Sequence, residues 1–450
     1  MTSSSLGRAV LVGVQLPGVS DEEHAGDLAE LRRLVRTLGY EVVGTISQRR
    51  ESLAAGTIVG EGKLKELAEL TGGKGIVPSG APERKSKARA RWAAERGDAP
   101  EDAPEPDPDD DPTRVHMVVV DHEITPTQAR NLERATGAAV LDRPGVIVDI
   151  FHRHARTREA RLQVEIARLK YVAPRMRESS DSERRAGRGA GESALELDRR
   201  KVRDRVSELR DELETIQKRD EGRRKGREGQ LRVALVGYTN AGKSSLMRAL
   251  TSSDVLVEDK LFATLDTTVR ALQPETKPRI LVSDTVGFIK KLPHDLVASF
   301  RSTLDEARDA SLLLYVVDAS DPTHDAQLEV TRNVLREIGA DTVPSKLLFN
   351  KCDRLDQAAR AALHSAHPDA VLLSAREPAD VQVLRQTIVE FFEAAMVDDE
   401  LVIPYDKQRL VGEVYEEARV LSEQYDDEGA RLTVRALPQT LARLRHAILG

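Results

Sequence analysis

Residues 231–251 read LRVALVGYTNAGKSSLMRALT, and this segment narrows the possible folds more than any other part of the chain. An apolar strand runs into a loop that carries Gly237, Gly242, Lys243 and Ser244, and a helix follows. Glycines let backbone N–H groups turn toward phosphate oxygens, and the helix N-terminus adds a partial positive charge. The order of strand, loop and helix predicts a P-loop, in which Lys243 reaches the β- and γ-phosphates and the Ser244 hydroxyl binds Mg²⁺.

Later segments indicate which other groups would face the nucleotide. The strand PRILVSD ends at Asp284, where a carboxylate can hold Mg²⁺ through water, and Gly287 leaves its amide open to a γ-phosphate. Asn350, Lys351 and Asp353 come directly after the strand KLLF. We expect the Lys351 stem to pack along a base and Asn350 to brace the loop.

The same loop predicts the identity of the base. The Asp353 carboxylate can accept hydrogen bonds from guanine N1–H and N2–H₂, which adenine does not offer. Downstream, VLLSAR contains Ser374 and Ala375, where a backbone amide can reach guanine O6. In this order and spacing the segments specify a G domain, and the predicted substrate is GTP.

The sequence does not identify the residue that would orient the attacking water, or the threonine of switch I that would bind Mg²⁺. In many G domains a glutamine after the DxxG glycine orients the attacking water, but DTVGF has Phe288 there. We therefore assign no catalytic residue and expect slow intrinsic hydrolysis. Thr264, Thr267 and Thr268 are all candidates for the switch I ligand of Mg²⁺, and spacing alone does not choose among them.

The region before the G domain is predicted to hold a separate α/β domain over residues 1–150. Apolar strands (AVLVGVQL, EVVGTIS, VHMVVVDHE) alternate with helical segments, which favours a largely parallel sheet. Between its halves, residues 98–112 are crowded with acids and prolines, and such a segment cannot bury enough apolar surface to offset chain entropy. We expect a disordered insertion at about 72–113.

Residues 151–229 are predicted to form an antiparallel helical hairpin. Leu195, Val202, Leu209 and Ile216 recur every seven residues, as in a coiled-coil seam, and the preceding helix carries a matching apolar stripe. Lys and Arg outnumber Asp and Glu here, although the whole chain carries a net charge of −7. The Gly/Arg-rich loop 174–193 is predicted to contact RNA through its arginines. These are Arg175, Arg177, Arg184, Arg185 and Arg188.

The composition excludes several classes of protein and of metal site. One cysteine, Cys352, excludes a disulfide framework and a cysteine-based metal site. No run of about 18 apolar residues occurs, and no secretory signal precedes the first strand. We expect a soluble, cytoplasmic monomer without a membrane-spanning segment, associated with a membrane peripherally if at all.

Several motifs together resemble the HflX family of translational GTPases. They are GYTNAGKSS, LFATLD, DTVGFI, NKCD, TIVGEGKLKEL and DRPGVIVDIFHRHARTREARLQVEIARLKY. The resemblance covers most of the chain outside 72–113. It implies a GTPase that binds the large (50S) ribosomal subunit and, when GTP-bound, dissociates stalled or idle ribosomes. Hydrolysis to GDP and phosphate then allows release. By family pattern the switch I metal ligand is Thr264, beside Ser244.

The predicted architecture is α/β. It comprises a P-loop G domain with a mostly parallel sheet flanked by helices (230–397), preceded by the N-terminal domain and the hairpin and followed by a small α/β C-terminal domain (398–450). We predict a GTP site built from four loops. Its residues are Gly237, Tyr238, Thr239, Asn240, Ala241, Gly242, Lys243, Ser244, Ser245, Phe262, Ala263, Thr264, Leu265, Asp266, Asp284, Thr285, Val286, Gly287, Asn350, Lys351, Cys352, Asp353, Ser374, Ala375 and Arg376.

Two other functions remain open at the level of sequence. A GTPase partner in tRNA modification would often use a cysteine, and only Cys352 is available. An RNA-remodelling ATPase or GTPase would act through the N-terminal domain, where Gly60, Gly62 and Lys63 form no complete phosphate loop.

Overall fold

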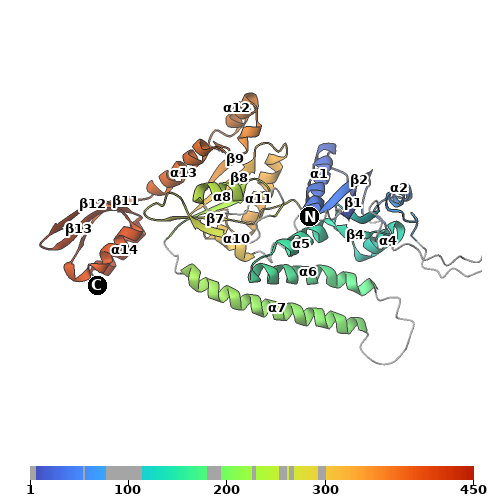
Figure 1. Ribbon diagram of the computed structural model, residues 1–450, viewed down its shortest axis with the longest axis horizontal. Helices are drawn as coiled ribbons and strands as arrows, with labels where there is room; N and C mark the ends of the chain where they lie inside the picture. The colour runs from blue at the N-terminus through green and yellow to red at the C-terminus, as the bar shows by residue number, and fades with distance from the viewer. Residues whose placement is uncertain are drawn as a thin grey trace, which may run out of the picture. The chain divides into compact units, whose positions relative to one another are not determined.

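The computed structural model describes residues 7–53, 56–77, 114–179, 194–225, 230–252, 261–262, 268–291 and 301–449 (Figure 1). The chain divides into two compact units. One comprises Met1–Asp149 with Pro174–Gly189, and the other Ile150–Ala173 with Ala190–Gly450. The finer four-part division that we expect from the sequence remains a prediction. In the described residues, no helix is both long and apolar enough to cross a membrane.

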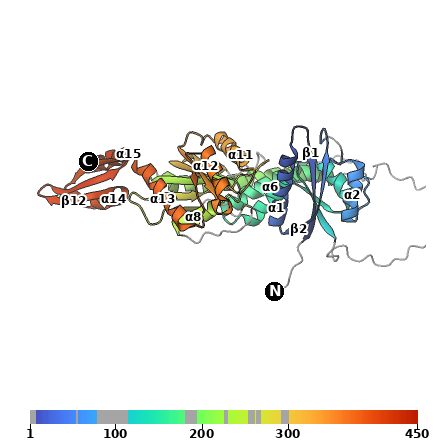
Figure 2. The same ribbon diagram turned by 90° about the horizontal axis from the view of Figure 1, so that it is seen from above.

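The first unit is built on a four-stranded parallel sheet of order β2-β1-β3-β4. Figure 2 shows helices α1 and α2 on opposite sides of it. Side chains that alternate along the strands, such as Val10, Val12 and Val118, pack on α2 and α4. The elements are β1 (Gly7–Gln15), α1 (Asp21–Thr37), β2 (Tyr40–Arg49), α2 (Glu61–Thr71), β3 (Val115–Val120), α4 (Pro126–Thr136), β4 (Ala139–Asp142) and the part of α5 (Arg143–His154) up to Asp149.

The start of the expected disordered insertion is ordered in the structure. Gly72 caps α2 in the left-handed conformation, and the Gly75 amide donates to the Ala135 carbonyl at 2.9 Å. A Cβ on Gly73 would lie 2.4 Å from the Ala135 oxygen, so this chain passes very close to the end of α4. Residues 72–77 thus belong to the packed part of the first unit, and residues 78–113 lie outside the described part of the chain.

Helices α6 (Arg158–Ser179) and α7 (Ala194–Lys225) run antiparallel and side by side (Figure 1). Leu162 and Ile166 of α6 bury against Leu209 of α7, with further seam residues partly buried around them. This is the packing that the heptad spacing predicts. The expected loop 174–193 begins too early, because α6 continues past Pro174 to Ser179. Proline costs a helix one backbone hydrogen bond and does not always end it.

The second unit contains a six-stranded sheet of order β10-β9-β8-β5-β7-β6, in which only β6 is antiparallel to its neighbour. Leu246 of α8 and Ile388 of α13 pack on one face, and Leu304 of α10 and Leu335 of α11 on the other. This confirms the predicted P-loop α/β fold. Its elements are β5 (Leu231–Gly237), α8 (Lys243–Thr251), β6 (Thr268–Ala271), β7 (Ile280–Asp284), α10 (Arg301–Arg308), β8 (Leu312–Asp318), α11 (His324–Glu337), β9 (Ser345–Asn350), η1 (Cys352–Arg354), α12 (Gln357–Ala366), β10 (Val371–Leu372) and α13 (Pro378–Glu393).

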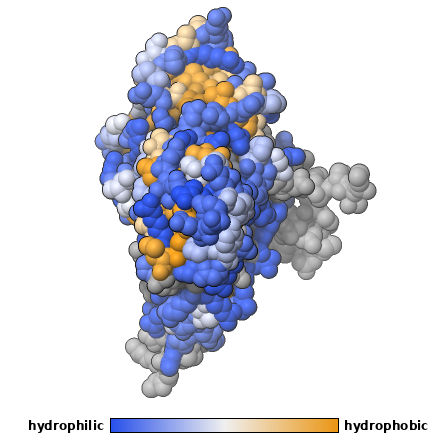
Figure 3. Space-filling view, turned by 90° about the vertical axis from the view of Figure 1, so that its left-hand side faces the viewer, coloured by the Kyte–Doolittle hydropathy of each residue, from blue (hydrophilic) through white to orange (hydrophobic). Residues whose placement is uncertain are grey.

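A three-stranded antiparallel sheet of order β11-β13-β12 follows and packs on two helices through Leu401, Leu432 and Leu441. Figure 3 shows a face of the molecule on which hydrophilic residues predominate and apolar ones gather in separate patches. The elements are β11 (Val397–Ile403), η2 (Tyr405–Lys407), α14 (Arg409–Glu417), β12 (Arg419–Asp426), β13 (Gly429–Ala436) and α15 (Pro438–Leu449).

Candidate nucleotide-binding site

The P-loop connects the carboxyl end of β5 to the first turn of α8, and two glycines shape it. Gly237 has φ 153°, and a Cβ there would lie 2.2 Å from the Val316 carbonyl oxygen of the neighbouring strand. Gly242 has φ 96°, and its Cβ would lie 2.1 Å from the Asn350 side-chain nitrogen. Only glycine fits both positions without displacing these groups. The loop is therefore pressed tightly against β8 and against the loop that follows β9.

Lys243, the first residue of α8, folds back over its own loop. Its Nζ donates to the carbonyl oxygens of Gly237 at 3.0 Å and Tyr238 at 2.8 Å. Burial lowers the pKa of Lys243 to about 8, an effect that the Asp284 carboxylate partly opposes. The ammonium group is thus held within the curve of the P-loop.

Asp284 ends β7 beside the start of α8. The Ser244 hydroxyl donates to the Asp284 Oδ2 at 2.7 Å, which places a hydroxyl and a carboxylate side by side. Nearby, a Cβ on Gly287 would lie 3.0 Å from the Lys243 Nζ and 2.8 Å from the Thr239 Cα. The Thr239 Oγ1 is buried and has no hydrogen-bond partner among the described residues. The Ser244 hydroxyl thus lies next to the Asp284 carboxylate, and the backbone of Gly287 lies close to Lys243 and Thr239.

The other predicted residues of the P-loop and of the DTVG segment differ in solvent exposure. Asn240 is exposed with φ 59°, whereas Ala241 and Val286 are buried. Ser245 is half-buried in the first turn of α8. The Thr285 hydroxyl donates to the Leu235 carbonyl at 2.7 Å and is fully buried. Thr285 therefore contributes its backbone rather than its side chain to the surface of this loop.

The Phe288 ring points into the core. It is 2% exposed and packs with Val236, Leu304 and Leu335. Its backbone joins the P-loop, since the Thr239 amide donates to the Phe288 carbonyl at 2.8 Å and the Phe288 amide to the Gly237 carbonyl at 3.1 Å. Phe288 is thus a structural anchor that ties the DTVG segment to the P-loop.

The loop after β9 is held in place by two side chains. The Asn350 Nδ2 donates to the Ala241 carbonyl at 2.9 Å, and its Oδ1 accepts from the Ala375 amide at 3.0 Å. The Lys351 Nζ contacts the Asn240 carbonyl and the Asp318 carboxylate, each at 2.6 Å. Three separate loops are thereby cross-linked by polar contacts.

Asp353 and Cys352 differ sharply in solvent exposure. Asp353 lies in η1 and is exposed, so its carboxylate is accessible to a base. Cys352 is buried, its Sγ donates to the Phe349 carbonyl at 3.2 Å, and burial raises its thiol pKa. A buried thiol with a raised pKa is a poor nucleophile, which disfavours a role for Cys352 in covalent chemistry.

The amides expected to read guanine O6 are already engaged. The Ser374 amide donates to the Asp380 Oδ2 at 2.8 Å, and the Ala375 amide donates to Asn350. The Arg376 amide donates to the Ser374 hydroxyl at 3.2 Å. The structure therefore places this loop beside the loop that follows β9, and all three amides already donate hydrogen bonds within the protein.

Asp318 and Asp380 are positioning residues that the sequence analysis missed. Asp318 ends β8 and contacts Lys351, and Asp380 in the first turn of α13 contacts the Ser374 amide. A carboxylate at the end of a buried strand, in LLLYVVD, was an available signal for Asp318. The contact of Asp380 depends on folding and had no comparable signal.

Phe262, at the start of the predicted switch I, is held by α5. Its ring contacts the Phe151 ring edge-on with centroids 4.5 Å apart, and its carbonyl lies 2.9 Å from the His154 Nδ1. Phe262 is buried and has φ 58°. The other predicted switch I residues, Ala263, Thr264, Leu265 and Asp266, lie outside the described residues.

Among the predicted RNA-contacting arginines, Arg175 has a different role. Its guanidinium donates to the buried Asp142 carboxylate at 2.7 Å and to the Ile124 carbonyl at 3.3 Å. This buried carboxylate needs a partner, so Arg175 joins the last turns of α6 to the sheet of its own unit. These contacts engage Arg175 within its own unit, and its contact with RNA stays a prediction. Arg184, Arg185, Arg188 and the Arg177 side chain lie outside the described part.

The residues at the start of α2, where the sequence has no complete phosphate loop, make local contacts. Lys63 pairs with Glu66 of the same helix at 2.6 Å, and the Gly60 amide donates to the Gln48 side chain at 2.8 Å. These groups are engaged in local contacts, which disfavours an ATP site built on TIVGEGKLKEL.

Three family models match the chain in succession. They are described as GTP-binding GTPase N-terminal (residues 25–77 and 110–152), GTP-binding GTPase Middle Region (154–227) and 50S ribosome-binding GTPase (232–351). A solved structure of SsGBP in complex with GDP is similar at 22% identity, with a TM-score of 0.45, over 86% of this chain and 98% of that one.

Curated relatives resemble nearly the whole chain. A GTPase HflX of Gluconacetobacter diazotrophicus is 67% identical, covering 98% of this chain and 97% of that protein. A GTPase HflX of Caldanaerobacter subterraneus is 35% identical, covering 98% and 94%. Identity of this extent, together with the P-loop G domain described above, shows that the chain belongs to the HflX family of GTPases.

Proposed function

We propose that this GTPase binds the large ribosomal subunit and uses its GTP-bound state to dissociate stalled or idle ribosomes. It would act in the cytoplasm as a monomer, and hydrolysis to GDP and phosphate would allow its release. The observation that carries the proposal is the match of residues 232–351 to a model described as 50S ribosome-binding GTPase. That segment contains the P-loop, the DTVG segment and, at its end, Asn350 and Lys351 of the NKCD motif.

The nucleotide would lie across the carboxyl ends of β5, β7 and β9. Lys243 would exchange its two carbonyl partners for β- and γ-phosphate oxygens, while the amides of the P-loop surround the β-phosphate. The exposed Asp353 carboxylate would accept from the guanine N1–H and N2–H₂, and the Lys351 stem would pack along the base. Asn350 would hold the P-loop and the loop after β10 in place, since it already bonds to Ala241 of the first and Ala375 of the second.

The residues around Ser244 fit a magnesium ion. A hydroxyl and a carboxylate oxygen lie 2.7 Å apart at the end of β7, and Mg²⁺ prefers oxygen ligands of this kind. Ser244 would ligate the ion directly, Asp284 would hold it through water, and Thr264 would complete the set from switch I. When bound, the ion supplies positive charge to the β- and γ-phosphate oxygens.

The surroundings of Phe288 explain why hydrolysis would wait for a partner. Its ring is buried, so this position supplies no group to orient water. A G domain without that group keeps its triphosphate until another surface completes the site. The ribosome would be that surface, so the GTP-bound state lasts long enough to separate the subunits.

Sedimentation of ribosomes provides the direct test. Ribosomes incubated with this protein and a non-hydrolysable GTP analogue should shift from the 70S to the 50S and 30S positions, with the protein in the 50S fractions. The same mixture with GDP, and one with Lys243→Ala and the analogue, should leave the 70S peak intact. An unchanged 70S peak at saturating protein would contradict dissociation, and absence of the protein from 50S fractions would contradict binding.

A further inference from the structure

A buried hydroxyl, that of Thr239, lies in the middle of the P-loop. Thr239 is 6% exposed, and its Oγ1 has no hydrogen-bond partner in the part of the chain that the structure describes. Such a hydroxyl costs free energy, whereas valine has nearly the same shape and no polar atom. Threonine is therefore unfavourable here for folding alone, which indicates that the hydroxyl has a partner when nucleotide is bound.

Thr239 is held where the P-loop meets the DTVG segment. Its amide donates to the Phe288 carbonyl at 2.8 Å, which fixes the backbone from which the side chain extends. A Cβ on Gly287 would lie 2.9 Å from the Thr239 Cγ2 and 3.0 Å from the Lys243 Nζ. The threonine side chain and the ammonium group thus both lie next to Gly287, on the predicted path of the γ-phosphate.

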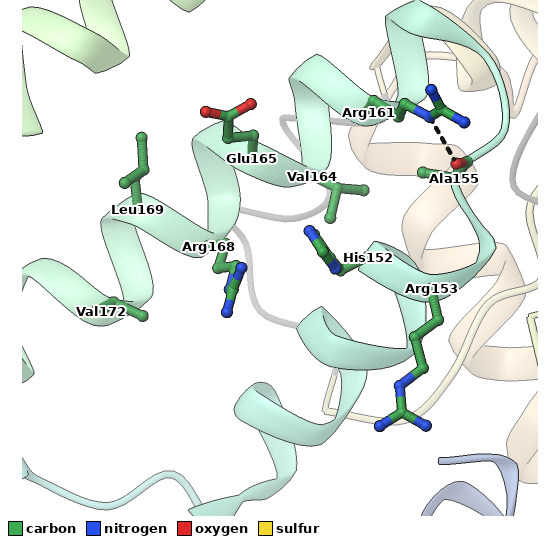
Figure 4. A pocket seen from close by; sticks show the side chains of 9 residues that line it. All are labelled: His152, Arg153, Ala155, Arg161, Val164, Glu165, Arg168, Leu169 and Val172. Carbon is green, nitrogen blue, oxygen red and sulfur yellow. Dashed lines mark hydrogen bonds between the residues drawn. The ribbon is translucent and has the colours of Figure 1, made fainter. Parts of the chain in front are cut away.

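The cavity at the end of α5 holds no comparable group. Its volume is about 670 Å³, and Figure 4 shows the Arg161 guanidinium bonded to the Ala155 carbonyl, at 3.3 Å. Val164 is 1% exposed, and Leu169 belongs to the α6–α7 seam. None of the residues that line this cavity, all of which the structure describes, has a buried side-chain nitrogen or oxygen without a partner. The unsatisfied hydroxyl of the P-loop therefore has no counterpart there.

The hydrolysis of GTP supplies the missing partners. We propose that the Thr239 hydroxyl accepts a hydrogen bond from the attacking water and donates its own O–H to a γ-phosphate oxygen. A hydroxyl has one donor and two acceptor lone pairs, so it can make both contacts at once. Because the Phe288 ring is buried in the core, this hydroxyl takes over part of the task that glutamine has in many G domains. This role rests on the proposed nucleotide position, in which Lys243 meets the γ-phosphate.

Thr239 acts by positioning the water and takes up no proton overall. The water oxygen forms a bond to the γ-phosphorus, and the bond from that phosphorus to the bridging oxygen of GDP breaks. One proton of the water passes to a γ-phosphate oxygen, so the products are GDP and inorganic phosphate. A single hydroxyl replaces only one contact to the water, so hydrolysis by the protein alone stays slow.

The test measures single-turnover hydrolysis of GTP by full-length variants. Thr239→Val removes the hydroxyl but keeps the shape, and Thr239→Ser keeps the hydroxyl. Thr331→Val is the matched control, because Thr331 is 1% exposed and its hydroxyl already donates to the Gln327 carbonyl at 3.0 Å. Lys243→Ala gives the background rate. Affinities for GDP and for a non-hydrolysable GTP analogue are measured in parallel, since they test the nucleotide site separately from the chemistry.

Thr239→Val should lower the rate at saturating GTP about tenfold or more, whereas Thr239→Ser and Thr331→Val should stay near the wild-type rate. These three variants should bind GDP as the wild type does, and in Thr239→Val the affinity for the analogue should fall less than the rate. Without nucleotide, Thr239→Val should unfold at a higher urea concentration than the wild type, because it no longer buries an unsatisfied hydroxyl.

The proposal fails if Thr239→Val keeps the wild-type rate, or if only its affinity for the analogue falls. It also fails if Thr239→Val unfolds at a lower urea concentration than the wild type, because the hydroxyl would then have a structural role. Absence of GTP and GDP binding by the wild type would contradict the nucleotide site itself, and the role of Thr239 with it.

Discussion

Lys243 combines a buried ammonium with a pKa of about 8, compared with an ordinary value of 10.5. Between these two pH values the unfolded chain binds more protons than the folded one, so the free energy of unfolding rises with pH across this window. Below about pH 8 the lysine is charged in both states and the difference is constant. The same group must be charged to bind phosphate.

Binding of GTP should therefore take up a proton above pH 8. Near pH 9, calorimetric titrations in buffers of different ionisation enthalpy should show proton uptake in the wild type. Below pH 7 the uptake should vanish. Lys243→Met should bind weakly and show no uptake at either pH, and equal uptake in the variant and the wild type would assign the proton to another group.

Asp353 is predicted to choose the base. Asp353→Asn should move preference from guanosine toward xanthosine nucleotides, because an amide complements the carbonyl that xanthine has where guanine has its amino group. The measurement is competition of GTP and XTP for the labelled GDP complex. A variant that keeps the wild-type preference for GTP would remove Asp353 as the reader.

Phe288 should matter for stability rather than for chemistry. Phe288→Ala leaves a cavity beside Val236 and Leu304 and should lower the free energy of unfolding by about 3 to 5 kcal/mol. Phe288→Leu should cost much less and keep the ribosome-stimulated rate of hydrolysis close to that of the wild type. A loss of about 10³-fold in the rate of a folded Phe288→Leu protein would instead indicate a direct catalytic role.

The elements that the sequence predicts best are those with a strong local pattern. The P-loop follows from glycine spacing between a strand and a helix, and the α6–α7 seam from a seven-residue repeat that includes Leu209. Contacts between distant segments left no such pattern. The contact of Lys351 with Asp318 depends on how the strands are ordered in the sheet, and that of Phe262 with Phe151 depends on where α5 packs. Local periodicity does not contain that information.

The last turns of α6 also make a contact with a distant segment that the local sequence does not reveal. Arginine-rich sequence favoured RNA contact, but Arg175 meets the Asp142 carboxylate, which is fully buried. Removal of the guanidinium takes one charged donor away from that carboxylate, which also accepts from the Ile124 and Gly145 amides. Helix α6 extends to Ser179, beyond the predicted start of the loop at 174.

Arg175→Gln should thus destabilise the first unit, by about 1 to 3 kcal/mol, in urea unfolding followed by circular dichroism. The salt dependence of binding to 50S subunits should stay the same, because no phosphate contact is lost. Arg200→Gln, at an exposed position of α7, is the matched control for stability. A smaller salt slope in a fully stable Arg175→Gln protein would restore the original RNA interpretation.

In the complete protein, we expect the rate of GTP hydrolysis to depend on the ribosome. Purified protein should hydrolyse GTP slowly and be accelerated by 50S subunits. Replacement of residues 184–191 by a few Gly and Ser residues should leave the intrinsic rate unchanged but weaken 50S binding and reduce its salt dependence. Splitting is then compared at protein concentrations that restore full occupancy. Normal splitting by the shortened protein under those conditions would exclude a mechanical role for this loop.

The backbone pairing of Tyr238 with Phe288 has a thermodynamic consequence for ligand binding. Ordering one residue of a free loop costs about 1 to 2 kcal/mol of conformational entropy. Here the P-loop and the DTVG segment are already joined by two hydrogen bonds and by a ring fixed in the core. These two segments therefore need little further ordering when GTP binds, so the loss of conformational entropy in them opposes binding only weakly.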